Sequence, residues 1–265
     1  MYVQELHLEM TRNCTLYCEH CLRGNKKCEN INVQTIDNVF KNVTGVYNLL
    51  LTGGEPLIAV RELEYLIEVL KERKISIGRI TLITNGTIMS ARVLKILKEL
   101  CSITYCHIDV SGDIFHKLEL QRLGLMELRN KNFEVLKRLF GSEEHGISYE
   151  KSNSYLSCVG RAEKLSSQRL SFINSMIEGN YIVKPGVRTM NQPETFIHNG
   201  NVFGYLSIDV NGNIVSYGQS YSEEDEESKR ICTNVNKVGF TNAVNNFIKY
   251  LDDKSIIAAP VILKK

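Results

Sequence analysis

The stretch Val46-Tyr-Asn-Leu-Leu-Leu-Thr52, which runs directly into Gly53-Gly54, decides the fold class of this chain. Its uninterrupted leucines predict a strand that is buried on both faces, as in a parallel sheet covered by helices. The two glycines predict the end of that strand. Apolar residues recur at helical spacing over residues 60–70, and a weaker version of the pattern precedes the strand at residues 37–43.

The same alternation continues on both sides of this unit. Further strands are predicted at residues 3–10, 80–84 and 106–110, further helices at residues 91–100 and 125–140, a fifth strand at 146–150 and a fifth helix at 170–177. Strands that alternate with helices imply a parallel sheet with right-handed crossovers, either doubly wound or closing as a barrel. Periodicity leaves that choice open and places no sixth unit.

The pattern changes in the last third of the chain. Residues 206–210 alternate between apolar and polar types up to Asn211-Gly212, and a second short apolar run follows, which predicts a hairpin. Thr241 can cap a helix whose apolar face includes Phe247 and Leu251. A hairpin followed by a helix is expected to form a small accessory region.

Length and composition limit the possibilities. A chain of 265 residues with 43% hydrophobic content fits one α/β domain with an elaboration, which we divide into a core of residues 1–184 and an accessory region of residues 185–265. The net charge of +2 gives no reason to expect a nucleic-acid partner. No apolar run reaches the roughly 18 residues of a membrane span, and the first five residues do not resemble a signal peptide. We expect a cytoplasmic protein without membrane contact.

Three of the eight cysteines form the spacing Cys14-x3-Cys18-x2-Cys21 directly after the first predicted strand. Nothing marks the chain for secretion, so metal ligation is favoured over disulfides. Three thiolates so placed can surround one corner of an iron-sulfur cube. Because such a cluster usually takes four cysteine ligands, three local ones leave one iron open to a non-protein ligand.

The run Asn13-Cys14-Thr-Leu-Tyr-Cys18-Glu-His20-Cys21 resembles the signature of the radical S-adenosylmethionine (SAM) superfamily. Members carry this signature in the loop after the first strand of a partial (βα)6 TIM-like barrel, so the resemblance implies that fold. It also implies SAM and one 4Fe-4S cluster as cofactors, with Cys14, Cys18 and Cys21 as the metal ligands. The aromatic residue before the third cysteine, here His20, would lie near the adenine of SAM.

Three further strand ends add to the resemblance. Thr52-Gly53-Gly54-Glu55-Pro56 is similar to the superfamily's GGE segment, which contacts the methionine amino group; glycines let a backbone approach a ligand and a carboxylate can accept from an ammonium. Thr84-Asn85-Gly86 and Ser111-Gly112-Asp113 resemble segments that line the SAM site. All these motifs end successive strands, the rim at which α/β barrels place their chemistry. The expected SAM contacts are Gly53, Gly54, Glu55, Thr84, Asn85, Ser111 and Asp113.

Two features favour a peptide substrate. Gly160-Arg161-Ala162 looks like a segment of peptide-modifying branches of the superfamily, in which an arginine can pair with the SAM carboxylate. The predicted hairpin and helix resemble the SPASM or twitch extensions of those branches. Such extensions hold auxiliary clusters on several cysteines, whereas this region contains only Cys232, so the resemblance is to a degenerate extension without a second cluster. The same chemistry on a small metabolite or nucleotide is the alternative.

The resemblance implies reductive cleavage of SAM to a 5′-deoxyadenosyl radical that abstracts a substrate hydrogen, with electrons from a one-electron reductant such as flavodoxin or ferredoxin. Cys158 could donate a hydrogen atom to a substrate radical or serve as an ordinary structural thiol. The acidic run at residues 223–227 predicts an exposed loop. An alternative of another class is a non-catalytic zinc- or cluster-binding module, in which a zinc site would use Cys28 as the fourth ligand.

Overall fold

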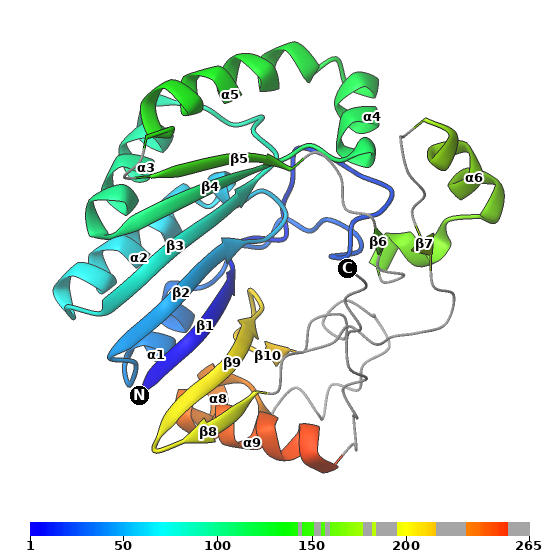
Figure 1. The fold of residues 1–265 in the computed structure, drawn as a ribbon. Helices are drawn as coiled ribbons and strands as arrows, with labels where there is room; N and C mark the ends of the chain where they lie inside the picture. The colour runs from blue at the N-terminus through cyan, green and yellow to red at the C-terminus, as the bar shows by residue number, and fades with distance from the viewer. Residues whose placement is uncertain are drawn as a thin grey trace, which may run out of the picture.

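The computed structural model of the chain describes residues 1–142, 145–150, 155–156, 160–176, 182–183, 195–215 and 232–253. Within them the main sheet has eight strands in the order β10-β9-β1-β2-β3-β4-β5, with β8 paired to β9 (Figure 1). These strands are β1 (Tyr2–Glu9), β2 (Gly45–Thr52), β3 (Ser76–Thr84), β4 (Tyr105–Ser111), β5 (Gly146–Glu150), β8 (Phe196–His198), β9 (Asn201–Ile208) and β10 (Ile214–Val215). A separate pair consists of β6 (Tyr155–Leu156) and β7 (Ile182–Val183).

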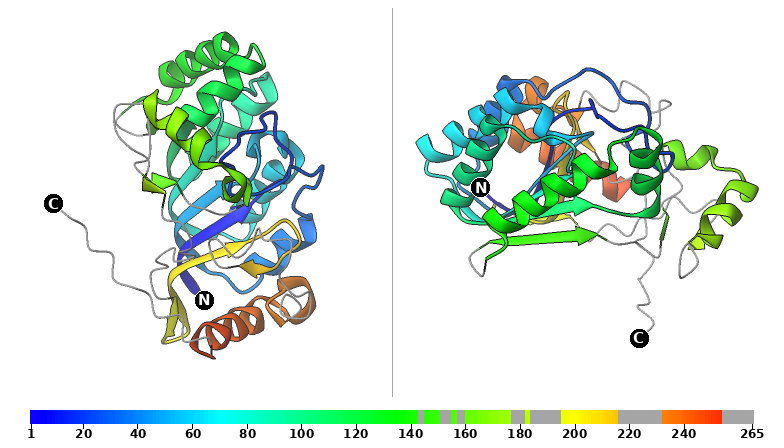
Figure 2. Two further views of the ribbon diagram at one scale, coloured as in Figure 1. Left: turned by 90° about the vertical axis from the view of Figure 1, so that its right-hand side faces the viewer. Right: turned by 90° about the horizontal axis from the view of Figure 1, so that it is seen from above.

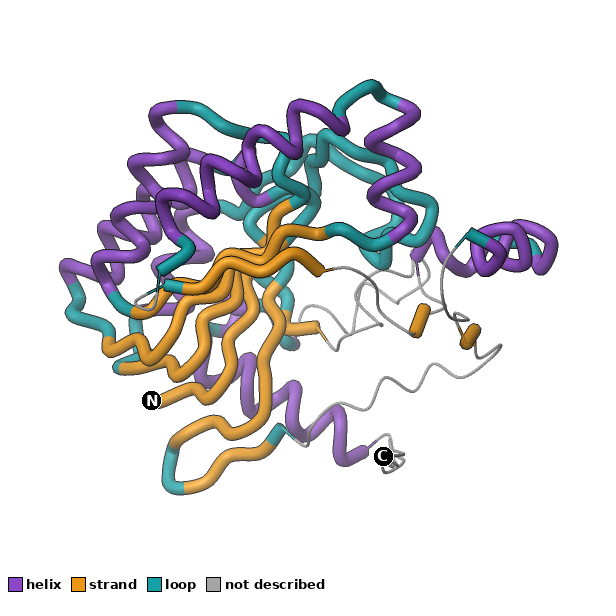
Figure 3. The backbone as a smooth tube through the Cα atoms, turned by 45° about the horizontal axis from the view of Figure 1, so that its top comes forward, coloured by secondary structure: helices purple, strands orange, loops and turns teal. Residues whose placement is uncertain are grey.

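Helices connect the strands of the first half of the chain. The helices are α1 (Val33–Phe40), α2 (Val60–Glu72), α3 (Ala91–Ile103), α4 (Ile114–Arg122), α5 (Met126–Phe140), α6 (Ser167–Ser175), α8 (Val235–Val238) and α9 (Phe240–Asp253), with short 3₁₀ helices at Pro56–Ile58 and Gly160–Lys164. Figure 1 shows α2, α3 and α5 on one side of the sheet, and Figure 3 shows helices gathered along that side. The predicted alternation is confirmed, and the fold is the expected α/β type with a parallel sheet and covering helices.

Strands β1 to β5 run parallel, and each pairs with its successor in the chain. In one row across the sheet, His7 lies opposite Leu50, Leu50 opposite Thr81, and Thr81 opposite His107. Because parallel strands point the same way, their carboxyl ends meet at one edge. The loops that follow β1, β2, β3 and β4 are therefore neighbours.

The sheet has two chemically different faces. The face that packs against the helices is apolar: Leu8 lies opposite Leu51, Leu51 opposite Leu82, and all three are fully buried in one hydrophobic core. Alternate residues point to the other face, where the row through His7 and the row through Glu9 carry mostly polar side chains. Burial of the helix-facing side stabilises the fold and leaves the opposite side free for a site.

Strand β9 is a sixth parallel strand, and it lies beside β1. Leu206 is paired with Leu6, Ser207 with His7, and Ile208 with Leu8, so the apolar residues of β9 join the same core. The sequence pattern placed no sixth unit because this pairing joins segments about 200 residues apart, which local periodicity does not report. At the other edge, β5 pairs only with β4 among the described residues.

The predicted hairpin and helix near the end of the chain are both present. Ile208 pairs antiparallel with Ile214 across the β9–β10 turn, and α9 buries Phe247 in the main core. The side chain of Leu251 and the acidic run at 223–227 lie outside the described residues. Figure 2 shows α9 beside β8 and β9 at the β1 side of the molecule. The division of the chain after residue 184 stays a prediction, because these elements share their core with β1 to β4.

Helix α4 is the main element that the sequence pattern missed. Its apolar residues are distributed around the helix instead of forming a stripe, so they give no helical signal. Asp113 begins the helix, because its carboxylate accepts from the backbone N–H groups of Phe115 (2.9 Å) and His116 (3.1 Å).

None of the described helices is both long and apolar enough to cross a bilayer.

Candidate functional site

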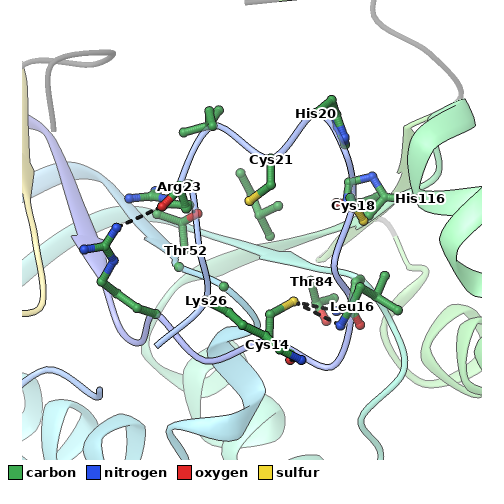
Figure 4. A pocket seen from close by; sticks show the side chains of 18 of the residues that line it. Cys14, Leu16, Cys18, His20, Cys21, Arg23, Lys26, Thr52, Thr84 and His116 are labelled. Atoms are coloured by element: carbon green, nitrogen blue, oxygen red, sulfur yellow. Dashed lines mark hydrogen bonds between the residues drawn. The ribbon is translucent and has the colours of Figure 1, made fainter. Parts of the chain in front are cut away.

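A cavity of about 230 Å³ lies at the carboxyl ends of the parallel strands. The loop that carries the cysteines covers one side of it, and Figure 4 shows the side chains of Cys14, Cys18 and Cys21 around one space. The residues that line the cavity are His7, Arg12, Cys14, Leu16, Cys18, His20, Cys21, Leu22, Arg23, Gly24, Lys26, Leu50, Thr52, Gly53, Gly54, Ile83, Thr84, Asn85, Ser111, His116, Arg161 and Ser207. The structure thus brings most of the predicted site residues to one hollow.

Backbone hydrogen bonds hold the cysteine loop against the end of β2. The N–H of Gly54 donates to the carbonyl of Thr11 (2.7 Å), and that of Glu55 donates to Asn13 (2.8 Å). A Cβ atom on Gly54 would lie 2.2 Å from the Asn13 carbonyl oxygen, and one on Gly53 would lie 2.4 Å from that of Thr11. The glycines are therefore required for the close approach of the cysteine loop, a reason that the sequence analysis did not anticipate.

The three cysteines differ in burial and partners. Cys18 is buried, while Cys14 and Cys21 are half-buried. Asn85 Nδ2 lies 3.5 Å from the Cys14 sulfur, and the Leu16 N–H lies 3.4 Å from it. Burial raises the pKa of Cys14 to about 11 and raises that of Cys18 as well. These thiols would lose their protons when a metal binds, because a metal favours the thiolate form.

The donor set fits an iron-sulfur cluster held by three cysteines. Three sulfur ligands reach one cavity from a single loop, and the cavity continues beyond them to the ends of β2, β3 and β4, where a further ligand of the open iron has room. Cys28, the fourth ligand of the zinc alternative, is exposed and does not line the cavity. Cys158, the candidate hydrogen donor, lies outside the described residues.

His20 lies among aromatic and acidic side chains. Its ring stacks on Phe115 with centroids 4.5 Å apart, and its Nε2 lies 3.4 Å from Asp113 Oδ2. Asp113 also contacts His116, whose Nδ1 lies 2.5 Å from the same oxygen. Burial of Asp113 opposes its ionisation, but the hydrogen bonds from His116 and His20 prevail and lower the pKa of this carboxyl. Asp113 is thus an anion that orients two imidazoles and begins α4. Sequence reasoning missed His116, although it lies only three residues after Asp113.

Glu55 is fully buried and joins the ends of β2 and β3. Its carboxylate accepts from the Thr84 hydroxyl (2.8 Å), the Asn85 N–H (2.7 Å) and the Leu57 N–H (3.1 Å). Burial raises the pKa of Glu55 to about 7, although these hydrogen bonds act in the opposite direction. The carboxylate that was expected to accept from a ligand ammonium already accepts from three internal donors, and it is not among the cavity-lining groups.

The segment that begins at Gly160 contacts the cysteine loop directly. The backbone N–H of Arg161 donates to the Cys21 carbonyl (3.0 Å), and its Nε donates to the Cys18 carbonyl (2.9 Å). A Cβ on Gly160, which has φ of +63°, would lie 2.6 Å from the Cys21 carbonyl oxygen. Arg161 Nη1 is buried and has no hydrogen-bond partner in the described part of the chain. A buried cationic N–H group at a cavity wall favours an anionic ligand such as a carboxylate.

Three further cations line the cavity on the β1 side. Arg23 Nη1 lies 3.1 Å from the buried carboxylate of Glu9, Arg12 Nη2 donates to the Arg23 carbonyl (2.8 Å), and Lys26 Nζ donates to the Cys14 carbonyl (3.3 Å). Sequence reasoning missed these residues, although their positions around the cysteine triplet were a usable signal. It could not find Ser207, because only the β9–β1 pairing brings that residue to the cavity.

Solved structures show the same fold in another protein. The crystal structure of Streptococcus suis SuiB bound to precursor peptide SuiA is similar with a TM-score of 0.50 and 13% identity, over 93% of this chain and 67% of that one. At this identity the likeness concerns the fold alone.

Two curated proteins are similar over shorter stretches. The "Putative L-lysine 2,3-aminomutase" of Aquifex aeolicus is 31% identical over 80 residues, 28% of this chain and 22% of that protein. The uncharacterized protein MJ0907 of Methanocaldococcus jannaschii is 24% identical over 102 residues, 37% of this chain and 36% of that protein. This chain therefore matches only about a fifth to a third of the length of these relatives.

The sequence profile of the Radical SAM superfamily matches residues 8–144, which is more than half of the chain. The matched region begins in β1, includes the cysteine loop and the ends of β2, β3 and β4, and stops shortly after α5. It therefore contains almost all of the cavity wall. The chain belongs to the radical SAM superfamily of enzymes.

Proposed function

We propose that this enzyme holds a single 4Fe-4S cluster on Cys14, Cys18 and Cys21, binds SAM in the adjoining cavity, and abstracts a hydrogen atom from a peptide substrate. One observation carries the proposal: three cysteines of one loop line the same 230 Å³ cavity as the strand-end motifs and Arg161. When bound and reduced, the cluster would supply the electron that cleaves SAM to a 5′-deoxyadenosyl radical.

The chain's own residues would bind and orient SAM. Arg161 would pair with the methionine carboxylate through Nη1, which has no partner in the described chain. His20 would lie near the adenine, held by Phe115 and Asp113. Backbone groups of Gly53 and Gly54 and the side chains of Thr84, Asn85 and Ser111 would complete the wall. Glu55, which does not line the cavity itself, would support this wall by fixing the ends of β2 and β3.

A peptide substrate is supported by the second half of the chain. The segment at Gly160 to Ala162 forms hydrogen bonds with the cysteine loop at the cavity wall. This segment is similar to one in peptide-modifying branches of the superfamily. The β9–β10 hairpin and α9 follow in the order found in SPASM or twitch extensions. SuiB, whose fold is similar, was solved with its precursor peptide bound. We propose that residues 185–265 contribute to substrate binding, and that flavodoxin or ferredoxin supplies the electron.

Anaerobic reconstitution with iron and sulfide tests the cluster assignment. We expect about four irons per chain, a SAM-dependent change in the EPR spectrum of the reduced cluster, and slow formation of 5′-deoxyadenosine from SAM with dithionite. Replacing Cys14, Cys18 and Cys21 together with alanine should abolish the cluster absorbance, while Cys101→Ala, on α3, should leave it intact. About eight irons per chain, or bound zinc without iron, would contradict the proposal.

Isotope transfer tests the substrate class. Short peptides and small metabolites, each uniformly deuterated, would be incubated with the reconstituted enzyme, SAM and dithionite. Mass spectrometry would then measure the deuterium content of the recovered 5′-deoxyadenosine. We expect deuterium to appear with a peptide, because hydrogen abstraction moves a substrate atom to the 5′ carbon. Deuterium from a metabolite or nucleotide only would favour the alternative substrate class.

A further inference from the structure

A second hollow, of about 410 Å³, lies between the cysteine loop and α6. Its walls include Tyr17 and Glu19 from the loop, Arg161 and Lys164 from the 3₁₀ helix that precedes α6, and Arg169 from α6 itself. Figures 1 and 2 show α6 at the edge of the molecule, away from the helices that cover the sheet. We call the hollow and the exposed side of α6 the α6 groove.

The α6 groove and the cavity share a wall at Arg161. Arg161 lines both hollows, and it donates hydrogen bonds to the carbonyl groups of Cys18 and Cys21. Its guanidinium lies 3.7 Å from the ring centroid of Tyr17, the residue that directly precedes Cys18. Tyr17 is 45% exposed. The Tyr17–Arg161 pair therefore links the wall of the α6 groove to the backbone of the cysteine loop.

The charges of the α6 groove are predominantly positive. Arg161, Lys164 and Arg169 face a single acid among the lining residues, Glu19, and Arg169 neutralises this acid with two bonds of 2.8 Å. Lys164 is exposed and makes no hydrogen bond or ion pair within the described residues. The groove therefore attracts negatively charged partners.

Exposed apolar side chains continue the groove along α6. Phe172 and Met176 are 51% and 46% exposed, and they lie one helical turn apart. The Arg169 guanidinium lies 5.2 Å from the ring centroid of Phe172. Aromatic residues, methionine and arginine are the residue types enriched at protein–protein interfaces. A small apolar centre beside basic side chains fits a transient protein partner with an acidic rim.

We propose that the α6 groove is the docking surface for an acidic one-electron carrier protein. The inference rests on the proposed function, because a cluster on Cys14, Cys18 and Cys21 needs an electron while SAM and substrate occupy its other side. With a flavodoxin, the anionic flavin hydroquinone gives one electron and becomes the neutral semiquinone. A cluster held by Cys14, Cys18 and Cys21 would take up this one electron, and no proton would need to move.

The experiment compares two electron sources on Lys164→Glu and on a matched control, Lys98→Glu. Lys98 is an exposed lysine of α3, a helix that lies on the opposite side of the molecule from α6 in Figure 1. An acidic flavodoxin reduced by its NADPH-dependent reductase, or dithionite, would drive 5′-deoxyadenosine formation by the reconstituted enzymes. With flavodoxin at low salt, Lys164→Glu should lower the rate by about tenfold, because electrostatic steering changes association rates by about 10- to 1,000-fold. The flavodoxin-driven rate of this variant should also depend less on salt concentration. With dithionite the rate should not change.

Binding provides a readout that does not depend on activity. Calorimetric titration with oxidised flavodoxin should show weaker affinity for both Lys164→Glu and Phe172→Ala. The loss of affinity in Lys164→Glu should grow as the salt concentration falls, whereas the loss in Phe172→Ala should be present at every salt concentration. The docking surface would be overturned if both variants bound flavodoxin with unchanged affinity, or if Lys98→Glu lost as much affinity as Lys164→Glu. It would also be overturned if Lys164→Glu slowed the dithionite-driven reaction as much as the flavodoxin-driven one. If dithionite produces no 5′-deoxyadenosine with the unaltered enzyme, the proposed function fails, and the titration still decides whether the groove binds the carrier.

Discussion

The two faces of the main sheet use the same strands for different purposes. On the helix-facing side, Leu6, Leu8, Leu49, Leu51 and Ile108 are fully buried in one continuous core. On the other side, neighbouring positions of the same strands line the cavity, among them His7, Leu50, Thr52, Ser111 and Ser207. The first set packs in the apolar core, and the second set is available for contacts with ligands. Adjacent residues of one strand are therefore expected to respond very differently to substitution.

The largest expected effect is on the helix-facing side, at Phe247 of α9. Phe247→Ala should lower the free energy of unfolding by about 3–5 kcal/mol, because the ring fills the shared core and its removal leaves a cavity. Urea denaturation measures this change. The remaining folded protein should bind SAM with unchanged affinity, because Phe247 does not line the cavity. A selective loss of SAM binding at low temperature, without a loss of stability, would contradict the separation of the two faces.

Glu55 is buried behind the cavity wall at the ends of β2 and β3. This residue is expected to make the stability of the fold depend on pH. Its pKa is about 7 in the folded chain and 4.5 without the fold's influence, so the folded state binds the proton more tightly. Stability from this group is complete below pH 4.5 and is lost as the pH rises through 7. At about 1.4 kcal/mol per pKa unit the total is roughly 3 kcal/mol.

Urea denaturation between pH 4.5 and 8 measures this effect, with Glu55→Gln as the comparison. The glutamine side chain does not titrate, so the stability of this variant should fall less over that interval than that of the unaltered chain. Identical pH profiles would show that Glu55 ionises in the fold at its ordinary pKa.

Arg161 should affect ligand binding more than stability. Arg161→Met should raise the Kd for SAM by about ten- to a hundredfold, the value of a charge-assisted hydrogen bond of about 1.5–3 kcal/mol. Arg138→Met, at an exposed position of the helix layer on α5, is the matched control and should leave the Kd unchanged. Calorimetry on the reconstituted proteins measures both. An equal Kd in both variants would remove Arg161 from the proposed SAM contacts.

The smallest effect is expected at Ser207, which gives the sharpest test of the comparison. Ser207→Ala, on the cavity side of β9, should change the free energy of unfolding by less than about 1 kcal/mol, the net value of one hydrogen bond. Leu206→Ala, one residue earlier and on the helix side, should cost about 2–5 kcal/mol. Similar losses of stability in the two variants would mean that β9 has no distinct cavity face.

Much of the fold and the site could be predicted because the decisive signals were local. The leucine run of β2 and the helical spacing of α2 are each contained within about ten residues. The cysteine triplet and the motifs at Gly53, Thr84 and Ser111 lie at strand ends, so the parallel topology alone was enough to place them at one edge. The structure brings them to the same cavity. Helix α4 escaped prediction because its cap, Asp113, was already assigned to a ligand and its apolar residues form no stripe.

The sequence by itself determined the βα order of the first half, the edge at which the motifs meet and the superfamily to which they point, because each depends on short-range patterns of polarity, glycine and cysteine. Only the tertiary structure decided that β9 joins β1, that Gly53 and Gly54 serve the approach of the cysteine loop, and that Arg161 bridges the cavity and the α6 groove. These features arise from contacts between segments about 40 to 200 residues apart. Such contacts depend on packing of the whole core, which no local pattern encodes.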